Sequence, residues 1–266
     1  MTDREPVVRV ESVSSGWEGV AVTEKVSFDV YPGEVFGILG ASGCGKSTLL
    51  KHMIGLFPPM AGRVLIHGED MAEARGVRRQ RLLTRIGVMY QQGALFGSMT
   101  LAENVALPIE EHARLPHAMR MRIAAAKLRE VGLDGFEAFY PDEISGGMRK
   151  RVAIARAMAL DPPVLFLDEP SAGLDPVSSA ELDKLILRLA HVLGITFVMV
   201  THEIPSIMAI VDRAVMLDKQ VKGIAAIGTP RQLRARTDHT FLARFFERAN
   251  QPCDDQPDDQ AAPETT

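Results

Sequence analysis

One glycine-rich stretch limits what this chain can fold into more than any other feature. Residues 40–48 read "GASGCGKST" and fit the pattern G-x-x-x-x-G-K-[ST]. They end a short apolar run, "VFGILG", and lead into the helical pattern "KSTLLKHMIGL". A loop of this kind turns successive backbone N–H groups toward a phosphate, and the following helix adds positive charge at its N-terminus. The stretch therefore predicts a P-loop that binds a nucleotide triphosphate.

Strands and helices alternate along the rest of the chain. "PVLFLDEP" and "ITFVMVTHE" are typical of buried strands, and the helical stretch "SSAELDKLILRLAHVLG" lies between them. Earlier strands are expected in residues 7–34 and 62–68, and a closing hairpin in residues 213–228. We therefore expect an α/β, RecA-like P-loop NTPase. It would combine a mostly parallel sheet, an antiparallel β subdomain and an α-helical subdomain inserted at about residues 92–160.

Composition sets the outer limits of size, compartment and partners. With 266 residues, 46% of them hydrophobic, the chain can build one large domain, and a net charge of −4 argues against general nucleic-acid binding. Two cysteines are too few for a disulfide framework, which favours a reducing compartment. No run approaches the roughly 18 apolar residues of a membrane span, and the first residues have no signal-peptide core. We assign residues 7–249 to the ATPase domain and the acidic residues 250–266 to a disordered tail.

Five side chains have the chemistry needed to hydrolyse ATP with Mg²⁺. Lys46 can reach the β- and γ-phosphates, and the Ser47 hydroxyl can ligate Mg²⁺. Asp168 and Glu169 end an apolar strand at the sheet edge where nucleotides bind. Asp168 is expected to hold Mg²⁺ through water, and Glu169 to act as the general base that polarises the attacking water. His202 ends "VMVTH" and is expected to hydrogen-bond the γ-phosphate.

Two positions near these residues leave alternatives open. Gln91 and Gln92 both follow the strand "IGVMY", and the amide of either could ligate Mg²⁺ and sense the γ-phosphate. Cys44 lies inside the loop, close to Lys46 and to a helix start, and both features lower a thiol pKa. The simpler interpretation of Cys44 is a small residue that fills space. We nevertheless expect a thiol-alkylating reagent to inhibit the enzyme through Cys44.

A second glycine pair opens another helix, "ISGGMRKRVAIARAMAL". Ser145, Gly146 and Gly147 can present a hydroxyl and backbone N–H groups to an anion at the start of this helix. The segment belongs to the inserted helical subdomain, away from the P-loop of its own chain. The simplest arrangement is a head-to-tail homodimer in which this segment covers the γ-phosphate of the partner's ATP.

Taken together, these motifs resemble the ATP-binding subunits of ABC transporters. "GASGCGKS", "YQQ", "ISGGM", "VLFLDEP", "SAGLD" and "VTHE" occur in that order, and the resemblance spans about residues 7–230. It implies a nucleotide-sandwich dimer bound to transmembrane permease subunits. It also makes Asp175 the D-loop aspartate, favours Gln91 over Gln92 as a third Mg²⁺ ligand, and makes Trp17 the residue that stacks on adenine. The expected ATP-binding residues are Trp17, Gly40, Ala41, Ser42, Gly43, Cys44, Gly45, Lys46, Ser47, Thr48 and Gln91, with Ser145, Gly146, Gly147 and Met148 as the signature that meets the partner's ATP.

Two features narrow the resemblance to the Mla/Mkl group of ABC ATPases. Met148 stands where glutamine or glutamate is usual, and "GALFGSMTLAENVALPI" follows the glutamines. That group moves phospholipids between the inner and outer membranes and was also described in organic-solvent tolerance. The resemblance implies a permease, a periplasmic Mce-type lipid-binding protein and a small STAS-type subunit, with the chain on the cytoplasmic face of the bacterial inner membrane. The alternatives are an importer ATPase for a polar solute such as an amino acid, and a non-transport ABC ATPase in assembly or cell division.

Two surface segments have competing interpretations. "TLAENVALPI" is apolar, and it would suit either a groove for a helix of a membrane subunit or ordinary core packing. "EARGVRRQRLLTR" contains arginines at 75, 78, 79, 81 and 85. A solvated helix face is the simpler interpretation of this run, and attraction to anionic lipid headgroups is the alternative.

Overall fold

The computed structural model describes residues 5–236 and 240–247. A six-stranded sheet forms its centre, with the strand order β10-β9-β3-β8-β7-β6. Strands β9, β3, β8, β7 and β6 are parallel, and only β10 runs antiparallel to its neighbour. The strands of this sheet are β3 (Val35–Gly40), β6 (Ile86–Met89), β7 (Val164–Asp168), β8 (Thr196–Val200), β9 (Arg213–Asp218) and β10 (Gly223–Gly228).

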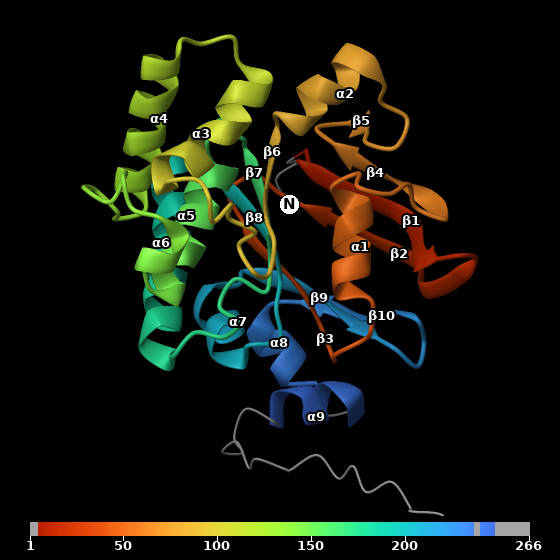
Figure 1. Cartoon of the computed structure of the whole chain (residues 1–266). Helices are drawn as coiled ribbons and strands as arrows, with labels where there is room; N and C mark the ends of the chain where they lie inside the picture. Colours follow the sequence, from red (N-terminus) through yellow and green to blue (C-terminus); the bar gives the residue numbers. More distant parts are fainter. Residues whose placement is uncertain (1–4, 237–239, 248–266) are drawn as a thin grey trace, which may run out of the picture.

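A smaller antiparallel sheet lies beside the central one, in the order β2-β1-β4-β5. Figure 1 shows this sheet on one side of the central strands, with α1 between the two sheets and α3 to α6 on the other side. The strands of the smaller sheet are β1 (Val8–Trp17), β2 (Val20–Val30), β4 (Ala61–Ile66) and β5 (Glu69–Asp70).

Helices cover both sides of the central sheet, and α3, α4 and α5 are inserted between β6 and β7. The helices are α1 (Lys46–Met53), α2 (Gly76–Leu83), α3 (Leu101–His112), α4 (His117–Glu130), α5 (Gly146–Ala157), α6 (Pro176–Leu193), α7 (Ile204–Ile210), α8 (Pro230–Arg234) and α9 (Thr240–Glu247), with a short 3-10 turn at Pro141–Glu143. Within the described residues, no helix combines the length and apolar character needed to cross a bilayer.

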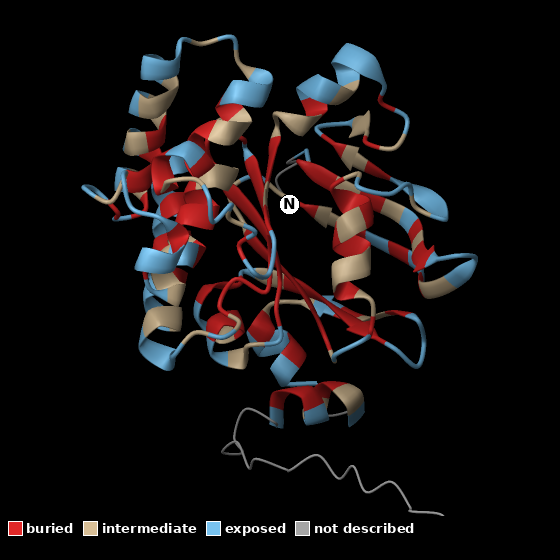
Figure 2. Ribbon diagram, viewed as in Figure 1, coloured by how far each residue is buried: buried red, intermediate tan, exposed pale blue. Residues whose placement is uncertain are grey.

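Strands β3, β7 and β8 are buried at every position, because the sheet is covered on both faces (Figure 2). Successive side chains of a strand point to opposite faces. Phe36 and Ile38 therefore join the core beneath α1 and the antiparallel sheet, while Val35 and Leu39 join the core beneath the helical side. The expected fold class is confirmed. Residues 250–266, expected to form a disordered tail, lie outside the described residues.

The structure bears on the two open surface segments in different ways. Five apolar residues of α3 are 0–5% exposed and pack into the core with α4 and α5, which supports core packing; they are Leu101, Ala102, Val105, Ala106 and Ile109. Leu107 and Pro108 are only half-buried, and the groove for a helix of a membrane subunit stays a prediction. Arg78 on α2 and Arg85, two residues after its end, both pair with Glu69, at 2.8 and 3.3 Å. Arg79 donates to the carbonyl oxygen of Gly55 at 2.7 Å. These bonds tie α2 to its own subdomain and support the interpretation as an ordinary helix surface.

Candidate active site

The P-loop connects β3 to α1 and has the shape of a phosphate cradle. Gly45 precedes α1 with a left-handed φ of 101°, and no side chain caps the helix. A Cβ on Gly45 would lie 2.8 Å from Thr23 Cγ2, so this turn needs glycine. The Lys46 ammonium donates to the carbonyls of Gly40 (2.9 Å) and Ala41 (3.2 Å), within the loop. The uncapped helix start and the buried ammonium together suit a bound polyphosphate.

Ser47 and Asp168 meet at the carboxyl edge of the sheet. The Ser47 hydroxyl donates to Asp168 Oδ1 at 3.0 Å. Burial raises the pKa of Asp168, and the hydrogen bond from Ser47 opposes that rise. No group of three histidine, cysteine, aspartate or glutamate side chains in the described part of the chain could hold a metal alone. The two oxygens fit Mg²⁺, which usually binds to one or two protein oxygens together with substrate phosphates and water.

Glu169 lies next to Asp168 in an unusual backbone conformation, with φ of 48°. Its N–H donates to the carbonyl of Val200 at 2.8 Å, which joins the ends of β7 and β8. The carboxylate Oε1 lies 2.9 Å from Nδ1 of His202, whereas Oε2 is buried and has no hydrogen-bond partner. A buried acceptor without a partner calls for an explanation, and a strained residue at a strand end is common in active sites. Oε2 is free to accept a hydrogen bond from a water molecule.

The segment after β6 is attached to α5 by two basic side chains. Lys150 donates from Nζ to the carbonyl oxygen of Gln91. Arg156 donates to the carbonyls of Gly93 and Ala94, at 2.7 and 2.8 Å. Sequence reasoning missed both residues, because α5 carries several basic residues in a row. The side chains of Gln91 and Gln92 are both exposed, so the choice between them stays a prediction.

Trp17 ends β1 and lies against the C-terminal part of α1. It packs edge-on against Phe57 with ring centroids 4.6 Å apart, and the Lys51 ammonium lies 5.8 Å from the ring centre. The backbone N–H of Gly16 donates to His52 Nε2 at 3.4 Å, which fastens the strand to α1. Trp17 itself is 39% exposed, so part of the ring is open for stacking. The contribution of His52 was not predicted, since nothing in the local sequence links it to residue 17.

The glycines of the second motif open α5 as expected. Ser145 caps the helix by accepting from the N–H of Met148 at 3.3 Å. Neither Gly146 nor Gly147 adopts a positive φ, and an added Cβ at either would make only ordinary contacts at 3.6 Å. The described residues therefore give no internal reason for glycine at these two positions. Asp175 caps α6 by accepting from the N–H groups of residues 177 and 178. Hydrogen bonds from the side chain and then the backbone of Ser178 lower the pKa of Asp175.

Residues 23–172 match the ABC transporter family. The chain belongs to this family. It is an ATPase that uses ATP and Mg²⁺.

Curated relatives from two groups of bacteria are similar over most of the chain. The intermembrane phospholipid transport system ATP-binding protein MlaF of Escherichia coli (strain K12) is 38% identical over 82% of this chain and 80% of its own length. The probable ribonucleotide transport ATP-binding protein mkl of Mycobacterium leprae (strain TN) is 39% identical over 90% of this chain. The chain spans about two thirds of the length of mkl, 68%. Membership of an Mla/Mkl-like branch of the ABC family is therefore confirmed.

Solved ABC cassettes share the fold. The ATP-binding cassette MJ0796, in a dimeric post-hydrolysis state with ADP and Pi, superposes with a TM-score of 0.75 at 29% identity over 84% of this chain and 99% of its own. The cassette cbiO1 of Clostridium perfringens, part of the ABC transporter complex cbiONQ, gives a TM-score of 0.79 at 27% identity over 93% of this chain and 100% of its own.

The thiol pKa of Cys44 differs from the one expected from the sequence. We expected Lys46 and the helix start to lower the pKa of its thiol. Instead, the side chain is 1% exposed, and burial raises the pKa more than the neighbouring Lys46 lowers it. The expected low pKa is wrong because a thiolate loses its hydration in this position. Cys44 fills space beneath the loop, as the simpler interpretation held.

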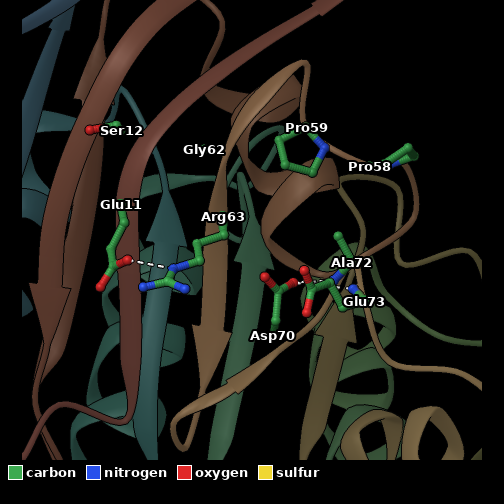
Figure 3. Close-up of a pocket in the computed structure, with 9 residues that line it drawn as sticks. All are labelled: Glu11, Ser12, Pro58, Pro59, Gly62, Arg63, Asp70, Ala72 and Glu73. Atoms are coloured by element: carbon green, nitrogen blue, oxygen red, sulfur yellow. Dashed lines mark hydrogen bonds and ion pairs between the residues drawn. The ribbon is translucent and has the colours of Figure 1, made fainter.

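An open cavity of about 500 Å³ lies on the antiparallel subdomain, away from the P-loop. Figure 3 shows the Arg63 side chain turned toward Glu11, and the two are joined at 2.6 Å. Asp70 Oδ1 accepts from the backbone N–H groups of Ala72 and Glu73, at 2.8 and 3.2 Å. The charged side chains of Glu11, Arg63 and Asp70 are therefore engaged with their own neighbours. None of the expected ATP-binding residues lines it.

Proposed function

We propose that the chain is the ATP-hydrolysing subunit of a bacterial ABC transporter that moves phospholipid between membranes. The observation that carries the enzymatic part is Glu169 Oε2, a buried acceptor without a partner at the sheet edge beside the Ser47–Asp168 pair. The phospholipid part rests on the similarity to MlaF across 82% of the chain and on Met148 in the signature.

Hydrolysis follows from the placement of these side chains. Lys46 and the N–H groups of the P-loop would hold the phosphates, while Ser47, Gln91 and, through water, Asp168 would hold Mg²⁺. When bound, Mg²⁺ neutralises charge on the phosphates. Glu169 accepts a proton from a water molecule through Oε2, and that water's oxygen attacks the γ-phosphorus. The bond to the bridging oxygen breaks, and ADP and phosphate are formed. His202 orients the carboxylate through Oε1 and contacts the γ-phosphate.

The second face of each ATP is covered by a second copy of the chain. The hydroxyl of Ser145 and the N–H groups of Gly146, Gly147 and Met148 would contact the γ-phosphate bound to the partner subunit. The ordinary space around both glycines supports this proposal, because close approach of a ligand is a reason to exclude side chains there. Asp175, the residue that caps α6, would link the two sites. The dimeric state of the related cassette MJ0796 is consistent with this arrangement.

The closing and opening of the dimer would drive transmembrane permease subunits at the cytoplasmic face of the inner membrane. By its resemblance to the Mla/Mkl group, the complex would also contain a periplasmic Mce-type protein and a small STAS-type subunit. Nucleic acid is not among the proposed partners, given the net charge of −4.

A polar solute is the second candidate for the transported molecule. The name of the mkl relative specifies ribonucleotide transport, and that relative matches over 90% of the chain. The ATP chemistry would be identical, so the active site does not separate the two candidates. A non-transport role in assembly or cell division would leave the same site without a permease.

Purification of the native complex through this chain distinguishes the candidates. The complex would be extracted from its membrane in detergent, and its proteins and lipids identified by mass spectrometry. A permease with an Mce-type protein and bound phospholipid would support the proposal. A permease with a receptor for a polar solute would replace the substrate but keep the ATPase, and the absence of any membrane protein would refute the transport role.

A further inference from the structure

Lys150 is a buried cation that the proposed chemistry does not use. It lies on α5, one helical turn after Gly146, and is 8% exposed. A lysine this buried is normally paired with a carboxylate. Within the described residues Lys150 forms no ion pair, and its ammonium donates instead to two backbone carbonyls, those of Gln91 and Glu169. Burial lowers the pKa of Lys150, while the charges of Glu169 and Asp168 oppose that shift.

The two carbonyls belong to the two segments that act on the γ-phosphate. Gln91 begins the exposed segment after β6 that is expected to sense Mg²⁺ and γ-phosphate. Glu169 holds the expected general base, and its backbone has the left-handed φ of 48°. The Glu169 carbonyl also accepts from the N–H of Ala172 at 3.2 Å. The ammonium of Lys150, on α5, donates to the same carbonyl at 3.4 Å. A strained conformation persists only when surrounding contacts hold it.

We propose that Lys150 is a positioning residue that ties the backbone of Glu169 to the Gln91 segment and to α5. Because Lys150 and Gly146 belong to one rigid helix, a displacement of the signature by the partner's ATP moves the ammonium that holds the base of the chain's own site. This inference rests on the proposed function in two respects, namely that Glu169 is the base and that the signature meets the partner's ATP.

Two other basic residues provide matched comparisons. Arg156 also lies on α5 and donates to the same segment after β6, but only to Gly93 and Ala94. It therefore separates anchoring of that segment from contact with Glu169. Lys127 on α4 is equally buried, and its ammonium pairs with Asp161 at 2.5 Å and with Glu130 at 3.1 Å. It therefore reports the general cost of removing a buried lysine from the helical subdomain.

The test uses the full-length chain with Mg²⁺ and ATP. The variants are Lys150→Met, Lys150→Gln, Lys150→Arg, Arg156→Gln and Lys127→Met. For each, kcat and KM for ATP are measured by phosphate release, and folding is checked by thermal unfolding. Lys150→Met is expected to lower kcat by about tenfold to a hundredfold, the cost of misplacing a catalytic group by roughly 1 Å. KM should change less than about twofold, because the P-loop residues that hold the phosphates are untouched.

Rescue and comparison decide the outcome. Lys150→Arg should recover most of kcat, since a guanidinium can donate to both carbonyls, and Lys127→Met should lower stability without the fall in kcat. If Lys150→Met does not fold, Lys150→Gln must show the same fall in kcat at unchanged KM. The proposal is overturned if Lys150→Met and Lys150→Gln retain wild-type kcat, if Arg156→Gln reproduces their full effect, or if Lys150→Arg is no better than Lys150→Gln. Near wild-type turnover in Glu169→Gln would instead refute the base assignment, whatever the Lys150 variants show.

Discussion

Replacing Glu169 by glutamine removes one proton acceptor and little else. The side chain keeps its length, and the amide oxygen can still accept from Nδ1 of His202, which lies 2.9 Å from Oε1 in the wild type. The atom that changes role is Oε2, the buried acceptor without a partner. As an amide nitrogen it can donate but can no longer accept a proton from water. The substitution therefore tests the general base with minimal disturbance of the fold.

The expected magnitude follows from that single change. General-base catalysis contributes about a hundredfold to ten-thousandfold, or roughly 2.7–5.4 kcal/mol of barrier at 1.36 kcal/mol per tenfold. We expect the upper half of this range, because the nearest other carboxylate, Asp168, already accepts from Ser47 and would hold Mg²⁺. ATP binding should be retained, since the P-loop is unchanged. Stability should not fall, because a neutral amide replaces a carboxylate that is 7% exposed.

Phosphate release under saturating Mg²⁺ and ATP measures kcat, and size-exclusion chromatography in ATP measures dimerisation. We expect almost no turnover together with an ATP-stabilised dimer in Glu169→Gln, and a monomer in the same variant without nucleotide. Glu169→Asp serves as the control, because it keeps a carboxylate but shortens its reach. A kcat within about threefold of wild type in Glu169→Gln would contradict the base assignment.

Three further predictions concern the P-loop. Lys46→Ala should weaken ATP binding and hydrolysis together, measured as a higher Kd for ATP and a lower kcat, because the ammonium contacts the phosphates in both states. Gly45→Ala should destabilise the protein by about 1–3 kcal/mol in urea unfolding, since its φ of 101° and the 2.8 Å approach to Thr23 Cγ2 leave no room for a Cβ. Alkylation of Cys44 by iodoacetamide should be slow at pH 7 and faster as the pH rises, because burial raises the thiol pKa and the thiolate is the reactive form. Rapid inactivation at pH 7 that is absent in Cys44→Ala would contradict this.

The positions of Asp168 and Glu169 were predictable because both residues lie at the end of a buried parallel strand. In parallel sheets, side chains that follow buried strands gather at one edge. Asp168 is the last residue of β7 and His202 lies two residues after β8, and both strands are recognisable in the sequence as apolar runs. The structure brings Ser47 to Asp168 and Glu169 to His202, across separations of 121 and 33 residues. Predicting these two contacts required only the parallel sheet, and no detail of side-chain packing.

Other features depend on packing that a single sequence does not encode locally. Lys150 reaches Gln91 across 59 residues, and its neighbours in the chain are also basic, so its burial leaves no local signal. For Cys44 the predicted pKa shift had the wrong sign. The nearby charge of Lys46 was visible in the sequence, whereas the burial that raises the thiol pKa was not. Among regular elements, the two-residue β5 and the helix α7, which begins four residues after β8 ends, were also missed. Both are too short to establish a hydrophobic period.

Helix α5 connects the signature, which would contact the partner's ATP, with the proposed base of the chain's own site. Gly146 at its N-terminus and Lys150 are four residues apart, a rise of about 6 Å along a rigid helix. Any movement of the signature is therefore transmitted to Lys150 almost undiminished. Because the backbone of Glu169 is strained, its productive position depends on the contacts that hold it, and Lys150 is the contact that comes from α5. Closure of the partner over one ATP and alignment of the base at the other site would then be a single event, which would make hydrolysis by an isolated subunit slow.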